Sequence, residues 1–152
     1  GERLDESGPV AQEMLSVKPF EVAKYEIVPD EKKIISARIK EWVDKLKLEL
    51  IVTSGGTGTA PRDVTPEATR EVIEREIPGM AEAMRAASLK ITSFAMLSRA
   101  IAGSRGRSLI INLPGSPKSV RECLEVVLPV VPHTLELLAG KTFEGPHERT
   151  VY

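Results

Sequence analysis

Small residues follow an apolar run in the middle of this chain and could bind an anion through their backbone, and an acid lies close behind them. The run Leu48–Val52 leads directly into Ser54–Gly58 (Ser-Gly-Gly-Thr-Gly), and Asp63 comes five residues later. Three glycines in four positions let the backbone adopt positive φ and approach a ligand closely. Consecutive N–H groups in such a turn can form a concave anion site. The pattern is neither a Walker A loop nor G-x-G-x-x-G, so a tight turn that needs glycine only for its geometry is the alternative.

A second acid, Asp30, lies between a predicted strand at Glu21–Val28 and a predicted helix that runs to about Leu46. Asp is a very common N-cap at such a position. At the carboxyl edge of a sheet it could instead be a catalytic or metal-facing carboxylate, provided that Asp63 lies nearby. Mg²⁺ favours one or two carboxylates together with phosphate oxygens. The residues alone leave both interpretations of Asp30 open.

The order of the apolar runs predicts an α/β domain with three layers. Leu48–Val52 and Ser108–Asn112 are apolar enough to be buried strands. The turn Leu113–Pro117 follows the second run, so it converges with the Ser54–Gly58 turn if the two strands are neighbours. Further helices are predicted at Pro9 to about Val17, from Thr65 onward with Thr65 as the N-cap, and at Met80 to about Leu89. The last predicted helix runs from Pro117 to about Leu138, with a break near Pro129 and Pro132. A helical turn is predicted at Phe94–Ala100 and a tight basic loop at Gly103–Arg107.

Composition limits the classes of protein. The chain has 152 residues, a formal net charge of −1 and 4% aromatic residues, without a basic tract, so nucleic-acid binding is not expected. We find no apolar run of membrane-spanning length and no signal peptide. The single cysteine, Cys123, excludes an internal disulfide, is expected to be a small buried side chain, and fits a reducing, cytoplasmic location. Two histidines are too few for a His-rich zinc site.

Two long segments resemble the molybdopterin adenylyltransferase family, which includes the N-terminal domain of gephyrin. They are GGTGTAPRDVTPEATREVIEREIPGM and SLKITSFAMLSRAIAGSRGRSLIINLPGSP, and the similarity extends to Tyr25–Glu31 and Asp5–Gly8. The resemblance implies a three-layer α/β/α domain with a mostly parallel central sheet and a homotrimer. It also implies transfer of AMP from Mg-ATP to the phosphate of molybdopterin, with release of pyrophosphate. The alternative is a non-catalytic trimerising scaffold module of a gephyrin-like protein, with a second domain or a molybdenum-insertion partner.

The resemblance assigns roles to individual residues. Asp30 and Asp63 correspond to the family's essential carboxylates, which act through Mg²⁺ or orient the pterin phosphate. The residues that would bind molybdopterin and ATP are Asp5, Ser7, Ser54, Gly55, Gly56, Thr57, Gly58, Ser98, Arg99, Pro114, Gly115 and Ser116. From the residues alone, Asp5 is a capping or solvated acid and Ser7 a candidate helix cap.

The sequence departs from the family pattern in two respects. Members begin with an apolar strand that this sequence lacks, and we expect that strand to be omitted from it rather than absent from the natural chain. Glu6 stands where arginine is usual, which reverses a charge near the expected entrance of the site. We expect residues 1–139 to form the domain and residues 140–152 a tail or linker.

Overall fold

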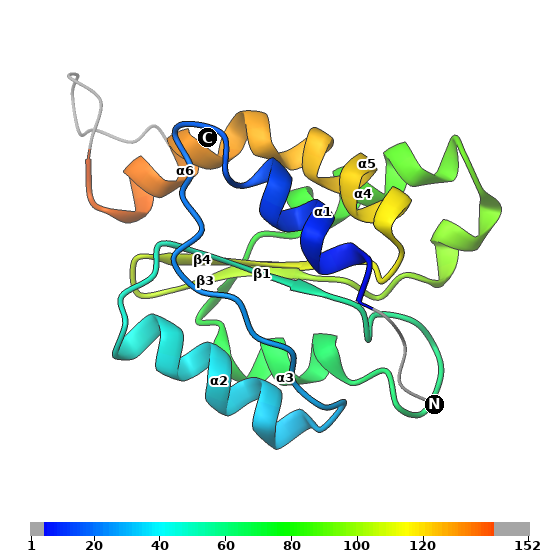
Figure 1. The fold of residues 1–152 in the computed structure, drawn as a ribbon, viewed down its shortest axis with the longest axis horizontal. Coiled ribbons are helices and arrows are strands. Elements are labelled where there is room, and N and C mark those ends of the chain that lie inside the picture. Colours follow the sequence, from blue (N-terminus) through cyan, green and yellow to red (C-terminus); the bar gives the residue numbers. More distant parts are fainter. Residues whose placement is uncertain (1–4, 142–152) are drawn as a thin grey trace, which may run out of the picture.

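A sheet lies between two layers of helices in this protein. The structure is a computed structural model that describes residues 5–141. Helices α1, α4, α5 and α6 cover one face of the sheet, and α2 and α3 cover the other (Figure 1). The helical segments are α1 (Ser7–Met14), α2 (Lys32–Asp44), α3 (Thr65–Val72), α4 (Pro78–Leu89), η1 (Ser93–Leu97), α5 (Pro117–Val127), η2 (Leu128–Val130) and α6 (Val131–Leu138). The expected three-layer architecture is confirmed.

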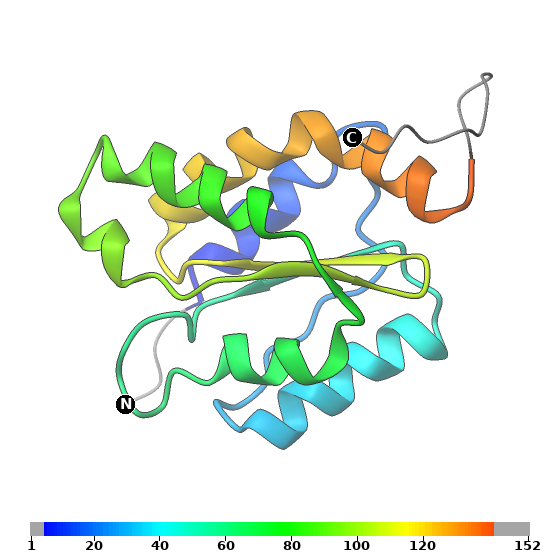
Figure 2. The ribbon, with the colours of Figure 1, turned by 180° about the vertical axis from the view of Figure 1, so that it is seen from behind.

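The sheet of the described residues is mixed, whereas we expected it to be mostly parallel. Its strands are β1 (Leu50–Ser54), β2 (Arg75–Glu76), β3 (Ala102–Arg105) and β4 (Ser108–Leu113), in the order β1-β4-β3-β2. The β1–β4 pair is parallel, and the other two pairs are antiparallel. A two-residue turn that begins with Gly106, at φ +55°, folds β4 back on β3 as a hairpin (Figure 2). The predicted loop at Gly103–Arg107 is therefore wrong, because most of it belongs to β3.

Both faces of β4 are buried, as its apolar run predicted. Leu109, Ile111 and Leu113 pack under the layer that contains α5, and Ile110 packs with Ile51 against α2 and α3. Successive side chains of a strand point to opposite faces, so one apolar run supplies both cores. Every residue of β4 is buried, which places the strand in the interior of the fold.

The C-terminal helix breaks where two prolines were expected to break it. α5 ends at Val127, Pro129 lies in η2, and α6 begins at Val131. Proline lacks the N–H that a helix interior requires, so the i→i−4 pattern is interrupted there. The predicted break is confirmed.

The expected helix caps are corrected by the structure. Ser7 and Thr65 lie inside the first turns of α1 and α3, and neither makes a capping hydrogen bond. Asp30 does not cap α2 either, since the N-cap position is Glu31. The capping interpretation of Asp5 is confirmed, because its Oδ1 accepts the Gly8 N–H at 2.9 Å. Residues that favour the N-cap position also occur next to it, so residue type alone does not show which of them makes the capping hydrogen bond.

The predicted strand at Glu21–Val28 is wrong. The segment is extended but belongs to no ladder, and Ile27 is 71% exposed. Figure 1 shows it passing from the α1 layer to α2 in front of the sheet. A cleft of about 910 Å³ is lined by residues of both this segment and β1. Alternation indicates one apolar face, but a strand also needs a hydrogen-bonded neighbour, which the described residues do not provide here. The tail expected at 140–152 lies almost wholly outside the described residues.

Candidate functional site

Two small-residue turns meet at the carboxyl ends of β1 and β4. The parallel register pairs Ser54 with Leu113, so both strands end side by side. Gly55 donates its N–H to the Leu113 carbonyl at 3.0 Å, and Ser54 Oγ donates to the Pro114 carbonyl at 3.0 Å. A Cβ on Gly115 would lie 3.4 Å from Gly55 Cα, so the backbones are close together. The predicted convergence of the two turns is confirmed.

The first turn needs glycine at Gly56 and exposes backbone donors. Gly56 has φ +68°, and a Cβ there would overlap Thr65 Oγ1 and lie 3.2 Å from Thr65 Cβ. Its carbonyl accepts the Thr65 N–H at 3.1 Å, which ties the turn to the start of α3. Within residues 5–141 the N–H groups of Gly56, Thr57 and Gly58 donate to no acceptor. Free donors at consecutive positions suit an anionic oxygen.

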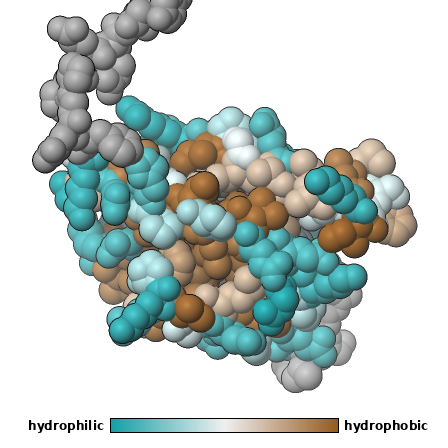
Figure 3. All heavy atoms as spheres, turned by 90° about the horizontal axis from the view of Figure 1, so that it is seen from above, coloured by the Kyte–Doolittle hydropathy of each residue, from teal (hydrophilic) through white to brown (hydrophobic). Residues whose placement is uncertain are grey.

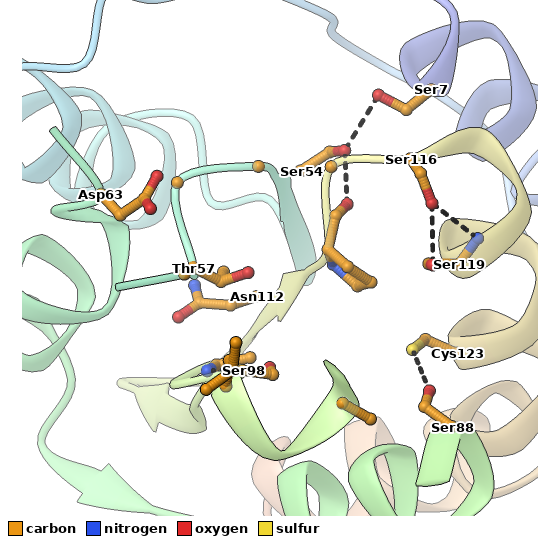
Figure 4. A pocket seen from close by; sticks show the side chains of 18 of the residues that line it. Ser7, Ser54, Thr57, Asp63, Ser88, Ser98, Asn112, Ser116, Ser119 and Cys123 are labelled. Atoms are coloured by element: carbon orange, nitrogen blue, oxygen red, sulfur yellow. Dashed lines mark hydrogen bonds between the residues drawn. The ribbon is translucent and has the colours of Figure 1, made fainter. Parts of the chain in front are cut away.

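A pocket of about 820 Å³ opens beside the two turns (Figure 4). Its lining includes all but one of the residues expected at the site: Asp5, Ser7, Asp30, Ser54, Gly55, Gly56, Thr57, Gly58, Asp63, Ser98, Pro114, Gly115 and Ser116. Glu6 also lines it, so the departure from the family pattern faces the pocket. Ser7 reaches it from α1, where Ser7 Oγ lies 3.1 Å from Ser54 Oγ.

The two acids line the same pocket from different elements. Asp63 Oδ2 accepts the Ala60 N–H at 2.9 Å, which orients the carboxylate toward its own loop. Asp30 comes from the connection that precedes α2. No group of three or more His, Cys, Asp or Glu side chains in residues 5–141 could hold a metal ion. A divalent cation here would therefore need oxygens from a bound ligand, which is how Mg²⁺ is usually held beside phosphates.

Arg99 is the one expected residue that the pocket lining lacks. Its guanidinium lies behind the loop and donates to the Gly58 carbonyl at 2.7 Å and the Asp63 carbonyl at 2.7 Å. It also forms two hydrogen bonds with the Glu67 carboxylate, at 2.5 and 3.1 Å. The Arg99 hydrogen bond lowers the pKa of Glu67, and Glu67 in turn raises the pKa of Arg99. Ser98, the preceding residue, does line the pocket.

Several lining residues were not expected from the sequence, and Asn112 is the best connected of them. Asn112 is fully buried, donates to Thr53 Oγ1 at 3.0 Å and Thr69 Oγ1 at 2.9 Å, and accepts the Ile101 N–H at 3.2 Å. Figure 4 shows it beside Thr57. A polar residue in the otherwise apolar run Leu109–Leu113 is a signal that could have revealed it.

Two arginines and the cysteine also lie along the pocket. Arg62 follows the glycine turn, and Arg85 of α4 donates to the Ala100 carbonyl at 2.7 Å. Cys123 is buried, with Sγ 3.8 Å from Ser88 Oγ, as expected for a small core side chain. Burial raises the pKa of the Cys123 thiol, which disfavours the nucleophilic thiolate.

In residues 5–141, backbone donors without acceptors and two carboxylates line one pocket beside the carboxyl ends of two parallel strands, and an α/β domain with such a pocket belongs to the class that binds phosphate-bearing ligands. The family model described as "Probable molybdopterin binding domain" matches residues 1–133, and the chain belongs to this family. No helix of residues 5–141 is long and apolar enough to cross a membrane.

Relatives and solved structures agree with this family. The molybdopterin adenylyltransferase of Helicobacter pylori J99 is 50% identical over 139 residues, covering 90% of this chain and 78% of the relative. The Drosophila melanogaster molybdenum cofactor synthesis protein cinnamon is 43% identical, but the matched part is 22% of that protein. The crystal structure of the molybdopterin biosynthesis enzyme MoaB from Thermus thermophilus aligns with a TM-score of 0.87 and 57% identity, covering 93% of this chain and 89% of that chain.

Proposed function

We propose that this chain is a molybdopterin adenylyltransferase of molybdenum cofactor biosynthesis. The observation that carries the proposal is one pocket lined by Gly56, Thr57 and Gly58, whose N–H groups find no acceptor in residues 5–141, together with Asp30 and Asp63. Relatives that bear this name are 40–50% identical over most of the chain, which supports the same activity here.

The proposed reaction is nucleotidyl transfer. A terminal phosphate oxygen of molybdopterin attacks the α-phosphorus of ATP, a new P–O–P bond forms, and the bond to the β-phosphate breaks to release pyrophosphate. The backbone donors of the glycine turn would stabilise negative charge on the transferred phosphoryl oxygens. The pocket walls would hold the two substrates in line, which is the main task of a protein in such a transfer.

The two carboxylates of the pocket fit a Mg²⁺ ion that binds together with the substrates. Asp30 and Asp63 would hold it together with phosphate oxygens of ATP, because two carboxylates alone make an incomplete site. When bound, the ion would neutralise part of the negative charge of the phosphates. Asp63 keeps its orientation through the Ala60 N–H, so it is the better placed of the two acids before any ligand arrives.

The test of this proposal is adenylyl transfer by the purified protein. With molybdopterin, Mg²⁺ and ATP, we expect pterin-dependent release of pyrophosphate and formation of adenylylated molybdopterin. Asp63→Asn should abolish turnover while the fold and the oligomer persist, and Asp30→Asn should do the same if Asp30 acts on the substrates. A folded wild-type protein that binds both substrates and forms no product would contradict the proposal and favour the scaffold alternative.

We also propose that the chain is a cytoplasmic homotrimer that works with a second domain or a molybdenum-insertion partner. An exposed apolar surface on the α4–η1 end supports self-association; it comprises Ile91, Phe94, Met96 and Leu97, each more than half exposed. Figure 3 shows apolar atoms gathered at that end of the molecule. Apolar surface of this kind is a common mark of a protein–protein interface. Light scattering combined with gel filtration would measure the oligomer, and a monomer would contradict this part.

A further inference from the structure

We infer that Arg99 is a positioning residue, which holds the pocket loop Thr57–Asp63 in the shape that the substrates need. The inference rests on the proposed function for its effect on turnover. Its structural part, that one guanidinium holds the loop, can be tested without any substrate. It also assigns Arg99 a different task from direct contact with the ligand, which the sequence suggested.

The contacts of Arg99 span the whole loop. Its backbone N–H donates to the Thr57 carbonyl at 2.8 Å, Nε donates to the Gly58 carbonyl, and Nη2 donates to the Asp63 carbonyl. One residue therefore binds both ends of a segment whose middle turns outward. Thr57, Gly58 and Asp63 all line the pocket, whereas Arg99 does not.

Glu67 fixes the direction of the guanidinium. The Glu67 carboxylate on α3 accepts from both Nη1 and Nη2 of Arg99. A planar fork with fixed donors can satisfy a carboxylate and two carbonyls at once, whereas a lysine ammonium is a single point of charge. Arg99 thus joins three parts of the site: the loop, the start of α3 and the segment that follows η1.

Arg85 of α4 holds the backbone on both sides of Arg99. Its Nη1 donates to the carbonyls of Ser98 and Ala100, the two neighbours of Arg99. The backbone around Arg99 is therefore tied down before its side chain reaches the loop. A rigid base is what lets a side chain set the position of a loop rather than follow it.

The experiment measures amide hydrogen exchange and kinetics on Arg99→Ala and Arg99→Lys. In the protein without substrates, we expect the hydrogen-bonded amides of Ala60 and Asp63 in the loop to exchange faster in Arg99→Ala, while β4 keeps its protection. In the adenylyl-transfer assay we expect kcat to fall about 100-fold, because a displacement of about 1 Å in a reacting geometry costs that much. KM for ATP should change by no more than about three-fold, since Arg99 does not reach the pocket.

Arg99→Lys and Glu67→Gln separate geometry from charge. Arg99→Lys keeps the charge but loses the fork, so it should recover less than about a tenth of the lost kcat. Glu67→Gln should speed exchange of the loop by less than Arg99→Ala, and the double variant should resemble Arg99→Ala alone. Arg70→Ala is the matched control: it removes an arginine of α3 whose partner is Glu76, at 3.5 Å, and it should leave loop exchange and turnover unchanged.

Three results would overturn the inference. Wild-type exchange of the Ala60 and Asp63 amides in Arg99→Ala would mean that the guanidinium does not hold the loop. A large rise in KM with unchanged kcat would mean that Arg99 contacts a substrate. If Arg99→Ala does not fold, Glu67→Gln decides, and unchanged exchange in that variant also overturns the inference. An inactive wild-type protein would refute the proposed function instead, and the exchange measurements would still decide the role of Arg99.

Discussion

Replacing Gly56 with alanine should destabilise the protein more than replacing any glycine that has open space around it. Gly56 has φ +68°, and the left-handed conformation costs a side-chain-bearing residue about 1 kcal/mol or slightly more. The new Cβ would also overlap Thr65 Oγ1, so the start of α3 must shift, at a further ~2 kcal/mol typical of overpacking. We therefore expect Gly56→Ala to lower the free energy of unfolding by about 3 kcal/mol, or Tm by about 9 °C.

The measurement is urea unfolding followed by the fluorescence of Trp42, the single tryptophan of the chain. Gly106→Ala is the control, because Gly106 has φ +55° but nothing within 4 Å of its Cβ position. It should cost about 1 kcal/mol, the conformational part alone. In a Thr65→Ala background the cost of Gly56→Ala should fall by about 1 kcal/mol. Equal costs at Gly56 and Gly106 would refute the steric argument.

Three further predictions concern buried and charged groups. Asn112→Leu should lower the free energy of unfolding by about 3 kcal/mol in the same urea assay, because it leaves the Ile101 N–H buried without an acceptor; a loss below about 1 kcal/mol would contradict this. Glu67 has a lowered pKa in the folded state, so its contact with Arg99 stabilises the protein above the ordinary pKa of 4.5 and is lost as the pH falls through the folded value. Wild type and Glu67→Gln should therefore differ in Tm at neutral pH and converge in acid; a constant difference would refute the linkage. Iodoacetamide should label Cys123 slowly at pH 8 in the folded protein and fast in urea, as followed by mass spectrometry, whereas equal rates would show an accessible thiolate.

Local signals accounted for much of the architecture. The apolar run of β4, the small residues after β1 and the prolines near Val127 each act through neighbouring atoms, so the buried strand, the glycine turn and the helix break could be predicted from the chain. The wrong predictions concern strand pairing, which the local pattern does not show. Alternation at Glu21–Val28 indicated a strand that has no ladder partner in residues 5–141, whereas the basic segment Gly103–Arg107, predicted as a loop, contributes three residues to β3, which pairs with β2 and β4.

The candidate site likewise combines residues that the sequence indicated with residues that only the structure revealed. Residue types alone marked Ser54–Gly58 and Asp63, because a glycine-rich turn after a strand can bind an anion and an acid lies close to it in the chain. The structural role of Arg99 could not be predicted from residue types, because its partners Gly58 and Glu67 lie 41 and 32 residues away in the chain. The sequence by itself determined most of the helices, the two buried strands and the small-residue turns that follow them. That the two turns meet depended on β1 and β4 being neighbours, which the structure shows. Only the tertiary structure decided that Asn112 supports the pocket and that Arg99 lies behind it, because hydrogen bonds between distant segments depend on how the layers pack.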